Sequence, residues 1–427
     1  MTSQLRSLFV VITFTSLLTS SLRAESWPGF RGAAGTGVST ETKLPSEWSQ
    51  SKNLAWKAKL DGRANSSPCV TADHVFVTTQ LDDKSLWVVC VARENGKVRW
   101  NVKVGAGELA AKGPKNLYAH RHNPATPTCA ADDKNVWTFF GTGLLLCLNA
   151  KSGDVVWSRD MVEDFGAYDI TFGMGSSPRL WGDVLYVSCM TKGASYVVAL
   201  NKSDGKEVWK KERRLPAEFD GPDAYSTPVV FKEQLLVSGS DHIDAYDLKS
   251  GKQLWLSSGL DIKSEFGRII ASPAVSDEVV IATSGNPGGG GLGRSIALKP
   301  GGKGDVTESH RLWVSQKTTP DSSSPLVYEG RVYMVSHEGI ASCLEPTTGE
   351  IAWRKRLSKG PYYAALVAGD GKVYFQSMEG VCTVVEAGDE GKVIAENSLS
   401  GEFYATPAIS DGTIFLRSYE GLYAISD

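Results

Sequence analysis

The chain has no long apolar run after its first 24 residues, and beyond residue 60 no stretch keeps an apolar period of 3.6 residues long enough for a good helix. These absences argue against membrane-spanning helices and against a helical repeat array. An excess of one charge is also missing, because 45 Lys and Arg stand against 48 Asp and Glu and the formal net charge is −3. Such a mild balance gives no signal for binding nucleic acid or a membrane surface.

Sequence signatures of nucleophilic and metal catalysis are absent as well. The chain contains no Gly-x-Ser-x-Gly elbow, no His-Glu-x-x-His and no Cys-x-x-Cys. Seven cysteines in an exported chain would ordinarily suggest disulfides and one odd thiol. Here Cys90, Cys147 and Cys343 occupy one equivalent small-residue position of a repeat, which favours free, buried thiols. A Cys69–Cys129 bridge between neighbouring inner strands is the alternative.

Residues 1–24 have the form of a signal peptide. Arg6 is an early cation, an apolar stretch covers residues 8–18, and residues 22–24 make a small-residue exit. The apolar stretch is too short to read as a membrane span, and no Cys stands at the cleavage point for a lipid anchor. We therefore expect a cleaved, periplasmic or secreted protein with no transmembrane anchor in the mature chain.

A repeat fills most of the remaining sequence. Its units open on Ser-Pro or Thr-Pro, most close on Trp, and their starts recur every 40 to 59 residues. This period is typical of four-stranded propeller blades or of helical arrays. Short alternating runs rich in β-branched and aromatic residues, such as 183–188 and 195–200, favour strands. The first six units run from Pro68 to Trp100, Pro127 to Trp157, Pro178 to Trp209, Pro228 to Trp255, Pro273 to Trp313 and Pro325 to Trp353.

Five units share the closing pattern Gly-x-x-x-Trp. The Gly mostly follows Asp, Asn, Ser or Thr, which is the chemistry of a tight hairpin with positive φ, so we place this turn between the third and fourth strands. The residue ten positions before the Trp is Cys or Ala, because large aromatics stacked between blades need small partners. The turn glycines are Gly96, Gly153, Gly205, Gly251 and Gly349.

The two ends of the chain supply the parts of one unit. A seventh unit keeps Gly391 but has Ala395 in place of Trp, and an eighth begins at Pro407 and lacks its closing strand. That strand is found around Trp56. We therefore predict an all-β, eight-bladed β-propeller of four-stranded antiparallel blades, forming a single domain over residues 51–427 and closed by the N-terminal strand.

Residues 25–50 are irregular and rich in Gly. We expect this segment to pack across one face of the ring before it delivers Trp56 to the eighth blade. On this view Trp56→Ala should destabilise the protein far more than Trp27→Ala. The run 288–293 nearly matches a phosphate-binding loop, but the strand that follows it, where a helix is required, indicates a plain loop.

Polar and aromatic residues precede the inner strands, where ring geometry puts the channel entrance. His120 and His122 would point to one side of an extended segment, as two metal ligands must, but no further ligand is identifiable and no metal is predicted. Tyr and Arg here suit recognition of a ligand or partner, and the alternatives are local hydrogen bonding and ordinary loop polarity. No catalytic residue is predicted, and cofactor-binding residues are unknown. The funnel candidates are His120, Arg121, His122, Asn123, Tyr168, Asp169, Tyr225, Arg268, Tyr362, Tyr363 and Tyr404.

The units resemble quinoprotein-like (PQQ-like) β-propeller repeats over residues 50–427. The matching signature is the Ser/Thr-Pro start, strands like 184–187 and 197–201, and then Gly205-Lys206-x-x-Trp209. Resemblance to the BamB-type propeller of the outer-membrane assembly machinery implies a scaffold that binds a partner protein without a cofactor. Resemblance to quinoprotein dehydrogenases implies pyrroloquinoline quinone (PQQ) and Ca²⁺ in the central funnel.

The absence of an adjacent Cys pair and of long insertions in the units favours the first of these branches. We expect an exported, non-catalytic, monomeric scaffold that recognises a protein partner or small ligand at the funnel face, with no cofactor and no nucleic acid. The alternative is an oxidoreductase that depends on PQQ and Ca²⁺.

Overall fold

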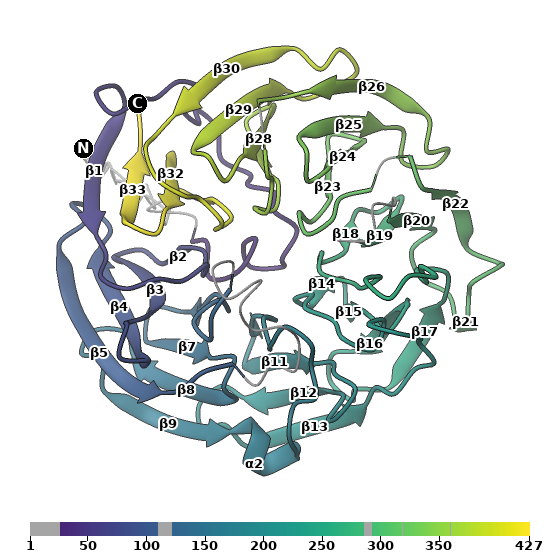
Figure 1. The fold of residues 1–427 in the computed structure, drawn as a ribbon, viewed down its shortest axis with the longest axis horizontal. Helices are drawn as coiled ribbons and strands as arrows, with labels where there is room; N and C mark the ends of the chain where they lie inside the picture. Colours follow the sequence, from purple (N-terminus) through teal and green to yellow (C-terminus); the bar gives the residue numbers. More distant parts are fainter. Residues whose placement is uncertain (1–25, 110–121, 286–292, 318, 359) are drawn as a thin grey trace, which may run out of the picture.

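The computed structural model describes residues 26–109, 122–285, 293–317, 319–358 and 360–427. These residues form eight antiparallel sheets around a central axis, as Figure 1 shows. The predicted eight-bladed, all-β propeller is thereby confirmed. No helix within the described ranges is both long and apolar enough to cross a membrane.

The first half of the ring contains four blades, and each runs from its innermost to its outermost strand in chain order. The first has β2 (Cys69–Val70), β3 (His74–Gln80), β4 (Ser85–Ala92) and β5 (Val98–Ala106), and the second has β6 (Ala130–Ala131), β7 (Asn135–Phe139), β8 (Leu144–Asn149) and β9 (Val155–Asp160). The third has β10 (Arg179–Trp181), β11 (Val184–Cys189), β12 (Tyr196–Asn201) and β13 (Glu207–Glu212), and the fourth has β14 (Val229–Phe231), β15 (Gln234–Gly239), β16 (His242–Asp247) and β17 (Gln253–Ser257).

The second half repeats this order and ends at the split blade. The fifth blade has β18 (Ala274–Val275), β19 (Val280–Ser284), β20 (Arg294–Leu298) and β22 (Arg311–Ser315), and the sixth has β23 (Leu326–Tyr328), β24 (Arg331–Val335), β25 (Ile340–Leu344) and β26 (Ile351–Arg356). The seventh has β27 (Val367–Gly369), β28 (Lys372–Gln376), β29 (Val381–Glu386) and β30 (Val393–Ser398), and the eighth has β31 (Ala408–Ser410), β32 (Thr413–Arg417), β33 (Gly421–Ile425) and β1 (Leu54–Lys59).

Two short elements lie outside this plan. Helix α2 (Met161–Phe165) follows β9, and the Asp160 side chain caps its first turn by accepting from Val162 and Glu163 N–H groups. The two-residue strand β21 (Gly304–Asp305) comes from the fifth repeat and pairs in parallel with β17 of the fourth blade.

In every blade except the seventh, the closing Trp lies beside a small residue of the third strand. In the third blade Trp209 is the direct partner of Ala199, which in turn pairs with Tyr186 on the second strand. The Tyr186 and Trp209 rings are 5.9 Å apart across the small residue. The ten-residue spacing therefore reflects a cross-strand aromatic pair, in which the small partner leaves room for both rings.

The turn Gly contacts the Trp of the preceding blade. Gly205 has φ +69°, and a Cβ added to it would lie 2.8 Å from Cε3 of Trp157. The Trp157 indole N–H also donates to Lys202 O, in the same turn, at 3.0 Å. Glycine is therefore required here for two reasons: the turn needs a positive φ, and the Trp ring of the preceding blade needs the space that a side chain would fill. The same contact joins Gly96 to Trp56, Gly153 to Trp100, Gly251 to Trp209, Gly349 to Trp313 and Gly391 to Trp353.

Ring closure uses the strand that the sequence assigned to it. β1 pairs with β33, which Figure 1 shows at the meeting of the two chain ends, and Trp56 is the direct partner of Ala424. The Trp56 indole lies 6.0 Å from the Phe415 ring and donates to Arg93 O of the first blade at 2.8 Å. The closing Trp therefore binds the last blade to the first.

The seventh blade obtains its missing Trp from the N-terminal segment. Ala395 stands at the Trp position and its partner is Val384, not a small residue. The second-strand aromatic of this blade, Tyr374, stacks on Trp48 with a centroid distance of 6.3 Å. Asn397 holds the segment in place by accepting from Trp48 N–H at 2.7 Å.

The burial of the two residues argues against the expected contrast in stability between Trp56→Ala and Trp27→Ala. Trp27 is only 2% exposed, less than Trp56 at 9%, and both belong to one apolar cluster. Trp27 also exchanges two 2.8 Å backbone hydrogen bonds with Val70. Because each substitution to Ala would empty a buried site, a large loss of stability is expected from both.

The seven cysteines are free and buried. Burial raises the pKa of Cys90 to about 12, so its thiolate is scarce at neutral pH. Cys90, Cys147 and Cys343 are the direct cross-strand partners of Trp100, Trp157 and Trp353, where they act as small apolar residues.

The contact between Gly and Trp can be separated from backbone strain with two substitutions. Gly205→Ala and Gly182→Ala both place a Cβ at positive φ, which costs about 1–2 kcal/mol. Nothing lies within 4 Å of a Cβ at Gly182, whereas one at Gly205 meets Trp157. We expect Gly205→Ala to lose roughly a further 1–3 kcal/mol by overpacking, measured by urea unfolding. Equal losses from the two variants would contradict the role given to the Trp contact.

Candidate functional site

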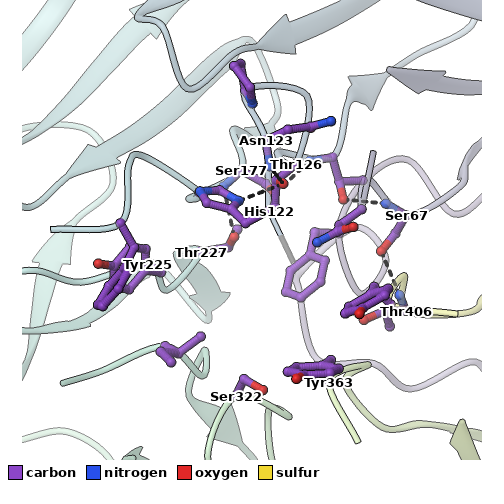
Figure 2. A pocket seen from close by; sticks show the side chains of 18 of the residues that line it. Ser67, His122, Asn123, Thr126, Ser177, Tyr225, Thr227, Ser322, Tyr363 and Thr406 are labelled. Carbon is purple, nitrogen blue, oxygen red and sulfur yellow. Dashed lines mark hydrogen bonds between the residues drawn. The ribbon is translucent and has the colours of Figure 1, made fainter. Parts of the chain in front are cut away.

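A cavity of about 540 Å³ lies on the ring axis, where the inner strands begin. Figure 2 shows side chains from several blades around it, among them His122, Tyr225, Ser322 and Tyr363. Its volume falls within the range of about 300–1,000 Å³ that is common for small-molecule sites.

The N-terminal segment closes the base of the cavity, and Figure 1 shows it crossing the centre of the ring. The Phe30 side chain lines the cavity from this segment. Backbone hydrogen bonds hold the segment below the inner strands: Val230 N–H donates to Ala34 O at 2.9 Å, and Ala368 N–H donates to Gly37 O at 2.9 Å. The channel is therefore a funnel with a floor.

Two buried arginines hold this floor, and a third, Arg417, lies between the eighth and first blades; each donates to backbone carbonyls. In the part of the chain that the structure describes, no carboxylate forms an ion pair with any of them. Burial lowers the pKa of Arg31 and of Arg179 to about 9, with mutual repulsion adding to the shift at Arg31, so both stay charged at neutral pH. Arg31 donates to Pro273 O and Pro325 O, Arg179 to Pro228 O, and Arg417 to Ser66 O.

A ring of hydroxyl groups encircles the funnel directly above this floor, and we call it the hydroxyl girdle. Each oxygen accepts a hydrogen bond from the backbone N–H of the equivalent residue in the preceding blade, at 2.9 to 3.0 Å. The ring is interrupted at the seventh blade, where the equivalent residue is Ala365. The girdle residues are Ser67, Thr128, Ser177, Thr227, Ser272, Ser324 and Thr406.

A second ring lies two residues before the first in every blade. An extended strand turns alternate residues to the same side, so both rings face the cavity. The side chains of this ring vary more in size and chemistry, so the sides of the funnel differ in polarity and shape. Its members are Asn65, Thr126, Gly175, Tyr225, Ile270, Ser322, Tyr363 and Tyr404.

The rim carries a continuous row of stacked side chains, which we call the aromatic rim. His337 meets Tyr363 edge-on at 5.1 Å, Tyr363 stacks on Tyr404 at 4.9 Å, and Tyr404 stacks on Tyr419 at 5.0 Å. The Arg63 guanidinium lies 4.3 Å from the Tyr419 ring centre and donates to its hydroxyl at 3.1 Å. All five residues are partly exposed, so the row joins the sixth, seventh, eighth and first blades in one rigid surface.

The opposite wall is polar. The Arg268 guanidinium pairs with Asp220 at 2.9 Å and lies 4.1 Å from the Phe172 ring. His122 Nδ1 and Thr126 Oγ1 are 2.7 Å apart, and His122 Nε2 is buried. Burial lowers the pKa of His122 to about 4, so the ring is neutral at pH 7.

The structure brings six of the predicted candidates to the cavity and sets others apart. Tyr168 is buried with its hydroxyl 3.6 Å from Cys189 Sγ, and Tyr362 is buried with its hydroxyl 2.9 Å from Ser358 Oγ. Asp169 does not line the cavity. His120 and Arg121 lie outside the described residues. The six that line the cavity are His122, Asn123, Tyr225, Arg268, Tyr363 and Tyr404.

Sequence reasoning missed the girdle, although its signal was present. Ser or Thr before the repeat Pro, which is the girdle residue in every blade that has one except the second, was interpreted as strand geometry, and its hydroxyl was not considered. The alternation from this position also separates Tyr363, which is in phase with the girdle, from Tyr362, which is not. Phe30 was not predicted because its segment lies outside the repeat.

Metal ligands do not gather in the described part of the chain: no group of three or more His, Cys, Asp or Glu side chains could hold an ion there. The two carboxylates in the described lining are Glu108 and Asp321. Glu108 pairs with Lys84 at 3.4 Å.

The sequence matches the model of a family described as outer membrane protein assembly factor BamB at residues 34–170, 84–355, 305–390 and 337–427. The resemblance found in the repeat is thereby confirmed. The Yersinia pestis protein named outer membrane protein assembly factor BamB is 24% identical over 275 residues, which are 60% of each chain. The present chain thus spans under two thirds of that relative.

Solved structures show the same fold. BamB from Moraxella catarrhalis has a TM-score of 0.61 at 15% identity, with 87% of this chain and 98% of that chain covered. Quinohemoprotein alcohol dehydrogenase from Comamonas testosteroni has a TM-score of 0.66 at 12% identity, with 95% and 81% covered. At these identities the likeness is one of fold.

The neutral, buried His122 should make stability depend on pH. Its pKa is about 4 in the folded protein against an ordinary 6.5, so between these values the unfolded chain binds a proton that the folded chain does not. Stability should therefore fall as pH falls from about 6.5 to 4, by up to about 1.4 kcal/mol per pH unit. Burial raises the pKa of Asp241 to about 6, which acts in the opposite direction, so variants must be compared.

The measurement is the melting temperature from pH 7.5 to 4.5. We expect His122→Gln to flatten the decline seen in the wild type, and His310→Gln, which lies outside the cavity, to leave it unchanged. Identical profiles for the wild type and His122→Gln would contradict the buried, neutral state of this ring.

Proposed function

Since the chain belongs to the family described as outer membrane protein assembly factor BamB, we propose that it is a non-catalytic scaffold that binds a protein partner. The family supports a role in assembly at the bacterial envelope. Residues 1–24, with the form of a signal peptide, support export to the periplasm or beyond.

The aromatic rim is the observation that carries this proposal. Tyr and Arg are enriched where protein partners bind, because each covers a large area and keeps a polar end for hydrogen bonding. Here three Tyr rings, His337 and Arg63 form one stacked row, so little side-chain entropy remains to be lost when a partner docks. A preorganised aromatic surface at the mouth of the funnel suits a protein partner.

The alternative is an oxidoreductase that uses PQQ and Ca²⁺. The cavity has the size for a small cofactor, which favours this reading. Calcium needs six to eight oxygen ligands, usually with several carboxylates. The described lining offers Glu108, which is paired with Lys84, and Asp321. This donor set does not fit a calcium-bound cofactor, and we derive no reaction from one.

Partner binding at the rim can be tested by site-specific photo-crosslinking in cells. A photoreactive residue at Tyr419 should form an adduct with one main protein partner, because Tyr419 is in the rim. The same residue at Val208, which is 49% exposed on the outer strand β13, is the matched control and should not. Tyr404→Ala, which breaks the stacked row, should reduce the adduct severalfold. Equal adducts from both positions, or none from Tyr419, would contradict the proposal.

The dehydrogenase alternative is tested with the purified protein, PQQ and Ca²⁺. We expect no dye-linked oxidation of alcohols or sugars, and we expect Ca²⁺ to add nothing to any thermal shift that the quinone alone produces. The quinone without Ca²⁺ and Ca²⁺ without the quinone are the controls. Turnover together with a Ca²⁺-dependent rise in melting temperature would replace the scaffold with the enzyme.

A further inference from the structure

The hydroxyl girdle offers hydrogen-bond donors to the cavity. A hydroxyl has one O–H donor and two lone pairs. In each girdle residue one lone pair accepts from the neighbouring blade, and within the described residues no protein group accepts the O–H. All seven residues line the cavity. The funnel therefore presents a circle of donors without protein acceptors.

Positive charge lies next to this circle. Each of the three buried arginines donates to the carbonyl of a residue adjacent in sequence to a girdle residue. Arg417 reaches Ser66, beside Ser67, and Arg179 reaches Pro228, beside Thr227. Each guanidinium is therefore separated from a girdle residue by one hydrogen bond and one residue of chain, which spans roughly 4 Å. Arg31 completes the set through Pro273 and Pro325, which follow Ser272 and Ser324.

Most charges higher in the funnel are compensated, and Asp321 adds a carboxylate to the lining. Lys84 pairs with Glu108, Arg268 pairs with Asp220, and His122 is neutral. The three buried arginines have no such partner among the described residues. Since buried charges interact more strongly than exposed ones, the base of the cavity is electropositive and lined by donors.

Apolar surface completes the site. Phe30 forms part of the floor, while Tyr363 and Tyr404 present ring surface on one wall. A ligand that suits this arrangement has an anionic, oxygen-rich end for the girdle and a body that can pack on aromatic rings.

We propose that the funnel binds a small carboxylate- or phosphate-bearing molecule, with its anionic group held by the hydroxyl girdle next to the buried Arg31, Arg179 and Arg417. This site extends the scaffold function and does not depend on a partner at the aromatic rim. The floor exists only when the N-terminal segment crosses the ring, so the ligand also stabilises the docked segment.

Isothermal titration calorimetry on the full mature chain tests the proposal. The probes are citrate, inorganic phosphate and, as a neutral polyol, glucose, all at matched ionic strength. We expect citrate or phosphate to bind with a Kd below about 1 mM and glucose not to bind. Binding by citrate alone would identify a carboxylate site, and binding by phosphate alone a phosphoryl site. Absence of anion binding at 10 mM probe, roughly the weakest affinity of a specific small-molecule site, or equal binding of glucose, would overturn the proposal.

Variants of the girdle connect binding to the hydroxyls. The double variant Ser177→Ala/Ser272→Ala removes two donors and should weaken anion binding about tenfold. Ala is tolerated at this position, because Ala365 occupies it in the seventh blade. The matched control, Ser177→Thr/Ser272→Thr, keeps both hydroxyls as in blades two, four and eight, and should bind like the wild type. Unchanged affinity in the Ala variant would overturn the role of the girdle.

A substitution in the opposite direction gives an independent measurement. Ala365→Ser would complete the circle with an eighth hydroxyl and supply an acceptor for Ser324 N–H. We expect binding at least as tight as in the wild type, and a melting temperature that is not lowered. Weaker anion binding in this variant would count against the proposal. Crosslinking at Tyr419 should be unaffected in all the girdle variants, so failure here and failure of the scaffold function can be told apart.

Discussion

The contact between the Trp of one blade and the turn Gly of the next is the constraint on which the rest of the structure depends. It sets how closely adjacent blades approach, because the ring lies where a Cβ would otherwise be. Seven nearly identical hydrogen bonds between inner strands add a second set of contacts between blades, including the seams between the fourth and fifth and between the seventh and eighth blades, where the Trp–Gly contact is missing. Where the fifth repeat lacks this turn pattern, Trp255 instead donates to Gln234 in its own blade, and β21 adds a parallel pairing outside.

The fold could be predicted because its determinants repeat. Trp, Gly and the small partner recur at fixed spacing, and each recurrence tests the interpretation of the others. Trp56 is an example. Its strand lies near the N-terminus, but the repeat pattern identified it as the closing strand of the C-terminal blade. Trp27 and Trp48 show its limit. Both lie outside the repeat, so its spacing could not predict their positions. Trp27 is buried beside Val70, and Trp48 replaces the Trp that is missing at Ala395.

The candidate site was only partly predictable for a related reason. The approach to each inner strand was identified correctly as a region, but the orientation of individual residues depends on their phase relative to the girdle. Tyr225 and Tyr363 are two residues before a girdle position and line the cavity, whereas Tyr362 is out of phase and points to the core. Tyr168 is farther from its strand, and the intervening loop buries it against Cys189. Phase was available from the sequence; loop packing was not.

The N-terminal segment joins the two levels of this structure. It supplies Trp48 to the seventh blade and Phe30 and Arg31 to the floor of the cavity, so one chain segment serves both ring stability and the site. Arg31 reaches the fifth and sixth blades while Arg179 of the third holds the segment's carbonyls, which means that the floor requires blades from both halves of the ring. Burying these two guanidiniums near each other opposes folding, as their lowered pKa values indicate. These two charges have no carboxylate partner among the described residues. An anion bound from the solvent side of the cavity would compensate them.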